Sequence, residues 1–471
     1  MNGWLIFIAL VVGYMGLLFW LVSSGRMQKW NLSLLLGFIL MIRTQKGRKL
    51  IDQISRPKRL WNAFGDFGTA LSLLGMVAMF LLMLLLVAPS LDPESGIEPL
   101  GASEILVIPG VNPFVPLWYG IIALIVTLVV HEGGHGVLAR AGNLRLKSLG
   151  LLYAIVPVGA FVEPDEEDLQ AAPLRTRLRV YAAGATVNIV LAAALVAVFA
   201  ALMGAAVPVE GVPVSAVPAD QPAHMAGIAP LDVLVAADGV PLATPAAFSA
   251  YLDNKSPGDQ VVFEARDGDS HTVTLGSRWD ALDEASQTRI LQGPEPEIVA
   301  SCNAVLSRPV ETRAECITAL QADAFVGINI FQTEGVQGAL AGPVDHIANF
   351  LFLISLPIGE VRDAPYLSTY LPAFFETPFS EDAYWITLNL VFWIFWINLM
   401  VGLTNILPMV PLDGGHIFRD AVGGIVQKLR PNMDPDRRTK IVGSAAAAIS
   451  FLVLGMFLLQ IFGPRIAQAF A

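Results

Sequence analysis

Six runs of apolar residues are the feature that most constrains how this chain can fold. Each is close to the roughly 20 residues that a helix needs to cross the hydrocarbon core of a bilayer. A soluble domain carries about 25% charged residues, whereas this chain of 471 residues is 15% charged and 55% hydrophobic. The sequence therefore predicts an α-helical multi-pass membrane protein with about six transmembrane helices. The runs lie at 3–22, 67–88, 116–139, 178–205, 385–407 and 441–462.

The lysines and arginines between these runs indicate which loops face the cytoplasm, where basic residues accumulate. Nine basic residues and one acidic residue lie between Gly25 and Leu60. Six more basic residues lie between Arg140 and Arg179, and another six lie between Arg419 and Lys440. With six crossings, all three segments face the cytoplasm only if both termini lie outside.

Two shorter apolar stretches would break this arrangement if they crossed the membrane. Leu32–Ile42 has about 11 residues, too few for a helix that spans a bilayer, and we interpret it as a strand or an interfacial segment. Ile347–Ile358 is also too short, and its crossing would reverse the side on which the last two helices begin. We interpret this second stretch as an interfacial or re-entrant helix.

The segment between the fourth and fifth runs has the composition of a soluble domain. Residues 210–345 contain 19 acidic and 6 basic residues, a net charge of −13 within a chain whose net charge is −11. Short alternating runs between Pro and Gly residues are typical of strands. A basic nucleic-acid footprint is absent. The two cysteines of the chain, Cys302 and Cys316, lie here, either as a disulfide in an oxidising compartment or as two buried thiols.

The third apolar run ends in the sequence His131-Glu132-Gly-Gly-His135. Residues four positions apart lie one above the other on a helix, so both imidazoles can reach one metal ion. Glu132 can then take a proton from a metal-bound water. Ionisable residues at membrane depth are costly and usually functional. The alternative interpretation is a polar patch at the end of the helix, which does not account for the spacing of the histidines.

A catalytic zinc needs a third protein ligand and one open position for water. The best candidate is Asp413, which follows Pro408 and Pro411 and precedes two glycines. Prolines break the helix, and glycines allow another segment to approach closely. The predicted topology places Asp413 at the same membrane face and depth as the two histidines. Taken alone, an acid before Gly-Gly is an ordinary turn signal.

These motifs resemble those of the site-2 protease family of intramembrane zinc metalloproteases, the M50-like peptidases. That family pairs an HExxH helix with an N-x-x-P-x-x-P-L-D-G motif, as in Asn405–Gly414. It also has an A-G-x-x-x-N pattern, which Ala183–Asn188 matches. The run Gly159–Glu167 is more similar to the archaeal and eukaryotic branch than to the common bacterial one.

The resemblance implies one Zn²⁺ per chain. Its ligands would be His131, His135 and Asp413, and Glu132 would be the catalytic base. Asn188 and Asn405 would bind the substrate backbone or the oxyanion. Hydrogen bonding between membrane helices is the alternative role for each asparagine.

The resemblance also predicts a membrane re-entrant β-loop between Leu144 and Glu163, beside the active site, where an extended substrate can add as a strand. Residues Gly211–Leu275 resemble the PDZ domains of proteases. Leu231 and Asp238 replace the usual Gly and Asn of that pattern. The soluble domain is thus expected to be a mixed α/β PDZ-like module, interrupted by an insertion at 278–323, and to take a peptide or protein ligand.

These observations predict a membrane protease of the cell membrane that acts on transmembrane protein substrates. The active site would lie near the cytoplasmic side and the PDZ-like domain would be extracytoplasmic. A catalytically silent scaffold and a metal-ion transporter are the alternatives; the first has no need for Glu132, and the second would show inverted repeats. The predicted segments are an N-terminal helix and basic segment (1–60), the first half of the protease core (61–206), the PDZ-like domain (207–345), an interfacial or re-entrant segment (346–384) and the second half of the core (385–471).

Overall fold

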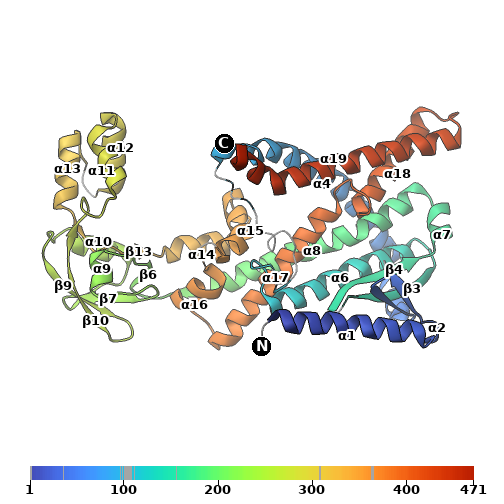
Figure 1. Ribbon diagram of the computed structural model, residues 1–471, viewed down its shortest axis with the longest axis horizontal. Coiled ribbons are helices and arrows are strands. Elements are labelled where there is room, and N and C mark those ends of the chain that lie inside the picture. Colours follow the sequence, from blue (N-terminus) through green and yellow to red (C-terminus); the bar gives the residue numbers. More distant parts are fainter. Residues whose placement is uncertain are drawn as a thin grey trace. The chain divides into compact units, whose positions relative to one another are not determined.

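The chain divides into two compact units in the computed structural model (Figure 1). Unit 1 comprises residues 1–198 and 389–471, and unit 2 comprises residues 199–388. The structure describes residues 3–35, 37–95, 97, 99, 109–110, 112–154, 156–306, 309–361 and 365–470.

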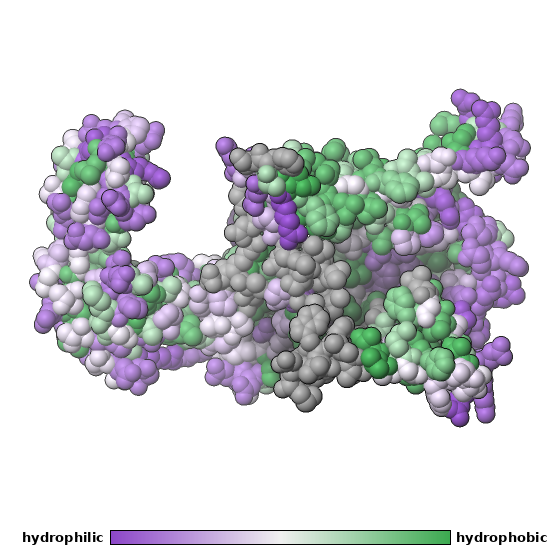
Figure 2. Space-filling model, in the orientation of Figure 1, coloured by the Kyte–Doolittle hydropathy of each residue, from purple (hydrophilic) through white to green (hydrophobic). Residues whose placement is uncertain are grey.

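Long apolar helices dominate unit 1, and their exposed side chains are mostly hydrophobic. Figure 2 shows apolar residues over the visible surface of α4 and α19, where Leu74 and Phe451 are 72% and 74% exposed. Such surfaces are stable in lipid and unfavourable in water. Among the described residues, five helices are long and apolar enough to cross a membrane: α4 (Lys58–Ser90), α6 (Leu117–Ala141), α8 (Leu174–Ala205), α17 (Glu381–Asn405) and α19 (Pro435–Phe470).

The multi-pass prediction is therefore confirmed, whereas the count of six spans stays a prediction. At the first predicted span the structure has helix α1 (Gly3–Ser23), whose side chains are described from Val11 onward. The stretch predicted not to cross forms α15 (Ile347–Val361). Its 15 residues give a helix of about 22 Å at 1.5 Å per residue, less than the thickness of the hydrocarbon core.

A four-stranded antiparallel sheet lies among the helices of unit 1. Its strands follow the order β1 (Leu32–Leu35), β2 (Ile39–Thr44), β3 (Leu146–Ala154) and β4 (Val156–Pro164). Of the two alternatives for 32–42, a strand or an interfacial segment, the structure has strands, β1 and β2. The β-loop predicted at 144–163 is present as β3 and β4, whereas its re-entry into the membrane stays a prediction. The pairing of β2 with β3, which sets Ile42 opposite Leu151, was not predicted.

Two clusters of buried side chains hold the sheet. Leu18 and Leu21 of α1 pack with Leu40 of β2, and the Tyr14 hydroxyl lies 2.7 Å from the carbonyl oxygen of Tyr153. A second cluster joins α6 to β3, to α8 and to α3 (Arg48–Ile54), and Val137 of α6 is among its buried members. The sheet therefore contacts both α1 and the helix that carries the HExxH motif.

A second antiparallel sheet forms the core of unit 2, with the strand order β10-β9-β7-β6-β13 and β8 paired with β7. Helices α9 (Pro222–Met225) and α10 (Pro245–Leu252) contribute Ala223 and Phe248 to its hydrophobic core. The strands are β6 (Val212–Ala216), β7 (Val233–Ala237), β8 (Val240–Pro241), β9 (Gln260–Ala265), β10 (Ser270–Thr274) and β13 (Asn329–Ile330).

The segment predicted as an insertion is helical and has a small core of its own. Two short strands, β11 (Gly276–Ser277) and β12 (Ala324–Phe325), pair with each other where it begins and ends. Cys302 and Cys316 form a disulfide, with Cα atoms 5.9 Å apart, a usual separation for such a bond. The helices are α11 (Glu284–Gln292), α12 (Glu295–Val305) and α13 (Arg313–Ala322).

The two positions that depart from the PDZ pattern both have left-handed backbone. Leu231 has a φ of 79° and Asp238 a φ of 50°, conformations that Gly and Asn adopt readily. At Asp238 the cost of the left-handed backbone is offset by hydrogen bonds. Its carboxylate accepts them from the Tyr251 hydroxyl, the Val262 amide and the Lys255 ammonium group. These bonds, that of Tyr251 foremost, lower the pKa of Asp238 to about 2. The side chain of Leu231 is 40% exposed and, being apolar, cannot offset its strain with hydrogen bonds of this kind.

We predict that Leu231→Gly stabilises unit 2 by up to about 1 kcal/mol, since left-handed backbone costs a β-carbon-bearing residue about 1–2 kcal/mol and glycine loses part of that gain to its own entropy. Hydrogen–deuterium exchange of the full chain should slow in β6 and β7. Asp238→Gly is the matched control: it relieves the same conformation but removes three hydrogen bonds, so exchange should quicken. Faster exchange in Leu231→Gly would contradict the prediction.

Candidate metal centre

Helix α6 brings two imidazoles together at its predicted cytoplasmic end. His131 and His135 are one turn apart, and their Nε2 atoms lie 3.3 Å from each other. His131 is only 8% exposed, so this ionisable side chain is buried within an otherwise apolar helix. Two buried imidazole nitrogens this close need either a shared proton or a shared cation.

Asp413 approaches the same two nitrogens from another part of the chain. It is the first residue of α18 (Asp413–Leu429), and its Oδ2 lies 3.3 Å from Nε2 of both His131 and His135. The chain reaches this place by folding back on the end of α17. A β-carbon at Gly414 would overlap the Ile406 carbonyl, and one at Gly415 would lie 2.6 Å from the Val410 nitrogen. The Gly-Gly pair is therefore needed for the turn that presents Asp413.

The three side chains fit a divalent transition metal. Their ligand atoms all lie within 4.8 Å of one another, as expected for ligands about 2 Å from a common ion. Asp413 Oδ2 is buried and has no hydrogen-bond partner among the described residues. Two imidazoles and one carboxylate form a typical donor set for zinc with one position left for water.

Gly184 of α8 completes the space around these ligands. A β-carbon at this position would lie 2.5 Å from Nε2 of both His131 and His135. Any side chain larger than hydrogen would therefore occupy the space into which the two nitrogens point. Sequence reasoning missed this role, although Gly184 belongs to the A-G-x-x-x-N pattern and lies one helical turn before Asn188.

The other ring nitrogen of each histidine has its own partner. His135 Nδ1 lies 2.7 Å from the Val180 carbonyl oxygen, which accepts its proton and leaves Nε2 free to bind a metal. His131 Nδ1 lies 3.1 Å from the Asn188 side-chain amide, which is fully buried. The structure thus brings one of the two predicted asparagines to the centre, behind a ligand ring.

Asn405 is not brought to the histidines in the same way. It is the last residue of α17, and its amide donates a hydrogen bond to the Val401 carbonyl of its own helix at 3.1 Å. This hydrogen bond lies within one helix, so it is neither the predicted substrate contact nor the bond between helices that was the alternative, and the role of Asn405 stays a prediction.

Glu132 faces the sheet. Its Oε2 accepts a hydrogen bond of 2.9 Å from the backbone amide of Val162 in β4, the edge strand. A cavity of about 520 Å³ opens beside it, between α6, α3 and the sheet. Glu132 is the one ionisable side chain among the described residues that line this cavity, and Ile51, Trp61 and Phe161 are among its apolar walls.

Comparison with known proteins agrees with this geometry. The family model described as Peptidase family M50 matches residues 119–453, which include every residue of the centre. The chain belongs to peptidase family M50, the site-2 protease family. An uncharacterised protein of Methanocaldococcus jannaschii is 20% identical over 461 residues, which cover 95% of this chain and 97% of that protein. A membrane-bound transcription factor site-2 protease homolog of Arabidopsis thaliana is 29% identical over 150 residues, which cover 29% of this chain and 28% of that protein.

We predict that Gly184→Ala weakens zinc binding by roughly 10- to 100-fold, the range seen when residues that orient metal ligands are changed. The added methyl group would displace both Nε2 atoms. Gly455→Ala in α19 is the control, because a β-carbon there meets nothing within 4 Å. Zinc content of the purified proteins, titrated against a chelator of known affinity, measures the effect. Equal affinity in the two variants would refute this role for Gly184.

Proposed function

We propose that this M50 protein is a zinc-dependent intramembrane endopeptidase that cleaves transmembrane segments of membrane-anchored regulatory proteins. The observation that carries the proposal is the convergence of His131, His135 and Asp413 on one point. Next to it lies a cavity in which Glu132 is the one ionisable side chain of the described lining. A zinc-bound water and a positioned carboxylate are the two components of metal-assisted peptide hydrolysis.

Bound zinc would supply a Lewis acid that polarises the peptide carbonyl and acidifies water. Glu132 would accept the proton of the attacking water and then deliver it to the leaving amine nitrogen, as a general base and then a general acid. His131, His135 and Asp413 would hold the ion. The Val162 amide orients the Glu132 carboxylate through a hydrogen bond to Oε2.

The surroundings of Glu132 favour an extended, apolar substrate. Strand β4 is the edge of its sheet, so a substrate segment can add to it through backbone hydrogen bonds. The adjoining cavity of about 520 Å³ is lined mostly by apolar side chains, with Thr44 and Glu132 among the exceptions, which suits the side chains of a transmembrane segment. A transmembrane helix must unwind locally to bind in this manner, because a strand needs free backbone donors and acceptors.

We assign Asn188 a positioning role for His131. If His131 binds zinc through Nε2, its Nδ1 carries the proton and needs an acceptor. The Asn188 amide oxygen provides that acceptor when the amide is oriented with oxygen toward the ring. The choice between oxygen and nitrogen of an amide rests on such hydrogen bonds, and this orientation gives the buried oxygen the partner that it otherwise lacks. Asn405, at the end of α17, is proposed as the residue that contacts the substrate backbone or the oxyanion.

The proposal extends to the other partners of the chain. Unit 2 would be an extracytoplasmic PDZ-like domain that takes a peptide or protein ligand, while the lipid bilayer surrounds the helices of unit 1. The scaffold alternative requires only unit 2 and predicts no use for Glu132. Cleavage therefore distinguishes the two functions.

The sidedness is testable by labelling single cysteines. Lys255 in unit 2 should face outward and Lys428 in α18 should face the cytoplasm, because basic residues accumulate inside. In a chain with Cys302→Ser and Cys316→Ser, an impermeant thiol reagent should label Lys255→Cys in intact cells. It should label Lys428→Cys only after permeabilisation. Labelling of Lys428→Cys in intact cells would reverse the proposed orientation.

The roles of the two carboxylates predict opposite phenotypes. Glu132→Gln should keep its zinc and lose cleavage by at least about 100-fold, since glutamine cannot accept a proton and general base catalysis contributes about 10²–10⁴-fold. Asp413→Ala should lose zinc, because it leaves two protein ligands. Zinc content and cleavage of a helical membrane substrate are measured on the purified variants. Full cleavage by Glu132→Gln would rule out the mechanism. Loss of zinc in Glu132→Gln but not in Asp413→Ala would mean that Glu132 is the ligand and Asp413 is not.

A further inference from the structure

A second polar cavity, of about 460 Å³, lies in unit 1 between the start of α8 and the facing parts of α18 and α19. Three arginines line it, Arg177 from α8, Arg419 from α18 and Arg438 from α19. They come from three helices that are far apart in the sequence. The cavity is separate from the metal centre and has no part in the mechanism above.

Only part of the positive charge in this cavity is balanced. Arg177 donates a hydrogen bond of 2.7 Å to Asp420, and Arg419 lies 3.6 Å from the same carboxylate. Arg438 is half-buried, yet its side chain makes no ion pair or hydrogen bond with any residue that the structure describes. Asp420 is the one acidic residue of the lining, so two positive charges remain in excess.

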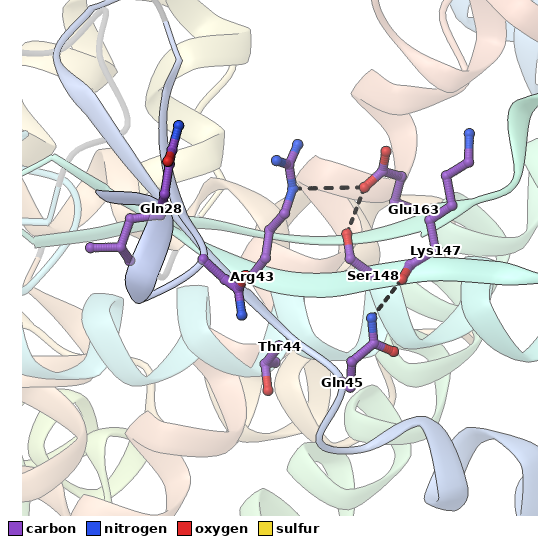
Figure 3. Close-up of a pocket in the computed structure, with 9 residues that line it drawn as sticks. Gln28, Arg43, Thr44, Gln45, Lys147, Ser148 and Glu163 are labelled. Atoms are coloured by element: carbon purple, nitrogen blue, oxygen red, sulfur yellow. Dashed lines mark hydrogen bonds and ion pairs between the residues drawn. The ribbon is translucent and has the colours of Figure 1, made fainter. Parts of the chain in front are cut away.

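In another cavity of unit 1, each basic side chain of the lining lies close to an acidic one. This cavity has a volume of about 600 Å³ and is lined by residues of β2, β3 and β4 (Figure 3). There Arg43 lies 3.9 Å from Glu163, and Ser148 donates a hydrogen bond of 2.5 Å to the same carboxylate (Figure 3). Lys147 lies 4.0 Å from Asp165. Each cation there already has an acid, whereas Arg438 has none.

Two glycines keep the arginine-lined cavity open. Gly423 of α18 and Gly443 of α19 both line it. A β-carbon at Gly443 would meet nothing within 4 Å, and one at Gly423 would only reach Val442 at 4.0 Å. Both positions therefore have open space beside them, within a lining that includes three guanidinium groups.

We propose that this cavity binds a phosphate-bearing anion. Guanidinium groups match the geometry of phosphate oxygens and bind them through paired hydrogen bonds. Basic pockets between membrane helices bind the head groups of anionic lipids. Beyond the cavity, α19 continues as an apolar helix whose Ile441 and Phe451 are 42% and 74% exposed, a surface along which acyl chains can lie. A soluble phosphate compound would use the same arginines without that surface.

Binding would also stabilise the helix that carries a metal ligand. Asp413 is the first residue of α18, and residues 419–427 of the same helix line the cavity. A ligand that binds only the folded arrangement of α18 and α19 stabilises that arrangement, by a free energy that rises with the logarithm of the ratio of ligand concentration to Kd. Anion binding would therefore be linked to the position of Asp413.

The test measures binding of three probes to the full-length protein purified in detergent: phosphatidylglycerol, phosphatidylcholine and inorganic phosphate. Native mass spectrometry follows the lipids, and isothermal titration calorimetry follows inorganic phosphate. Phosphatidylglycerol bound at least tenfold more tightly than phosphatidylcholine identifies a lipid head group. Binding of inorganic phosphate without that lipid preference identifies a soluble anion. Absence of both results overturns the proposal.

Three variants locate the site. Arg438→Gln should weaken binding about tenfold, the loss that accompanies removal of one charge-assisted hydrogen bond. Arg437→Gln is the matched control, because it removes the same charge from the next residue, which does not line the cavity. Gly443→Leu keeps every charge but fills the cavity, so it should weaken binding at least as much. Equal losses in Arg437→Gln and Arg438→Gln, or full binding by Gly443→Leu, would show diffuse surface attraction and overturn the site.

Discussion

The metal centre depends on how closely other helices approach one short stretch of α8. Around Gly184 this helix has small side chains, so its neighbours contact it almost at the backbone. A β-carbon at Gly134 of α6 would lie 3.1 Å from the Ala183 carbonyl, and one at Gly402 of α17 would lie 3.3 Å from the Ala185 carbonyl. Small residues allow this packing in membranes, where helices gain little from the hydrophobic effect. Because α6 and α17 both pack closely on α8, the histidines of α6 lie next to Asp413, which follows α17.

The position of Glu132 depends on a part of the chain that lies outside the family match. Its partner Val162 belongs to β4, which pairs with β3, which in turn pairs with β2 of the N-terminal hairpin. That hairpin precedes residue 119, where the match to family M50 begins. Because the sheet is also fixed to α1 through Tyr14 and Leu18, the N-terminal segment supports the carboxylate that we propose as the general base. A truncation before α4 would therefore disturb Glu132 without changing a metal ligand.

The sequence was most informative where a physical rule acts over a short distance. Helix periodicity was enough to place His131 and His135 on one face, and apolar length was enough to predict α4, α6, α8, α17 and α19. Contacts between distant segments were harder to predict. No local pattern links Ile42 to Leu151, since β pairing between hairpins about 100 residues apart leaves no periodic signal. The two asparagines were equivalent as sequence features, and only the packing of α8 against α6 separates Asn188, at His131, from Asn405, on its own helix.

The burial of Asp413 is explained by the three candidate ligands taken together, and not by any one sequence motif. A buried carboxylate oxygen without a hydrogen-bond partner costs about 1–3 kcal/mol or more, and Asp413 Oδ2 is such an atom in the part of the chain that the structure describes. Two imidazoles could offset this cost by carrying protons, but His135 already gives its Nδ1 proton to Val180. A second proton on that ring would make it a cation among apolar helices, 3.3 Å from the other imidazole. A single divalent cation satisfies all three ligand atoms at once, which is the simplest reason for this sequence to bury an acid there.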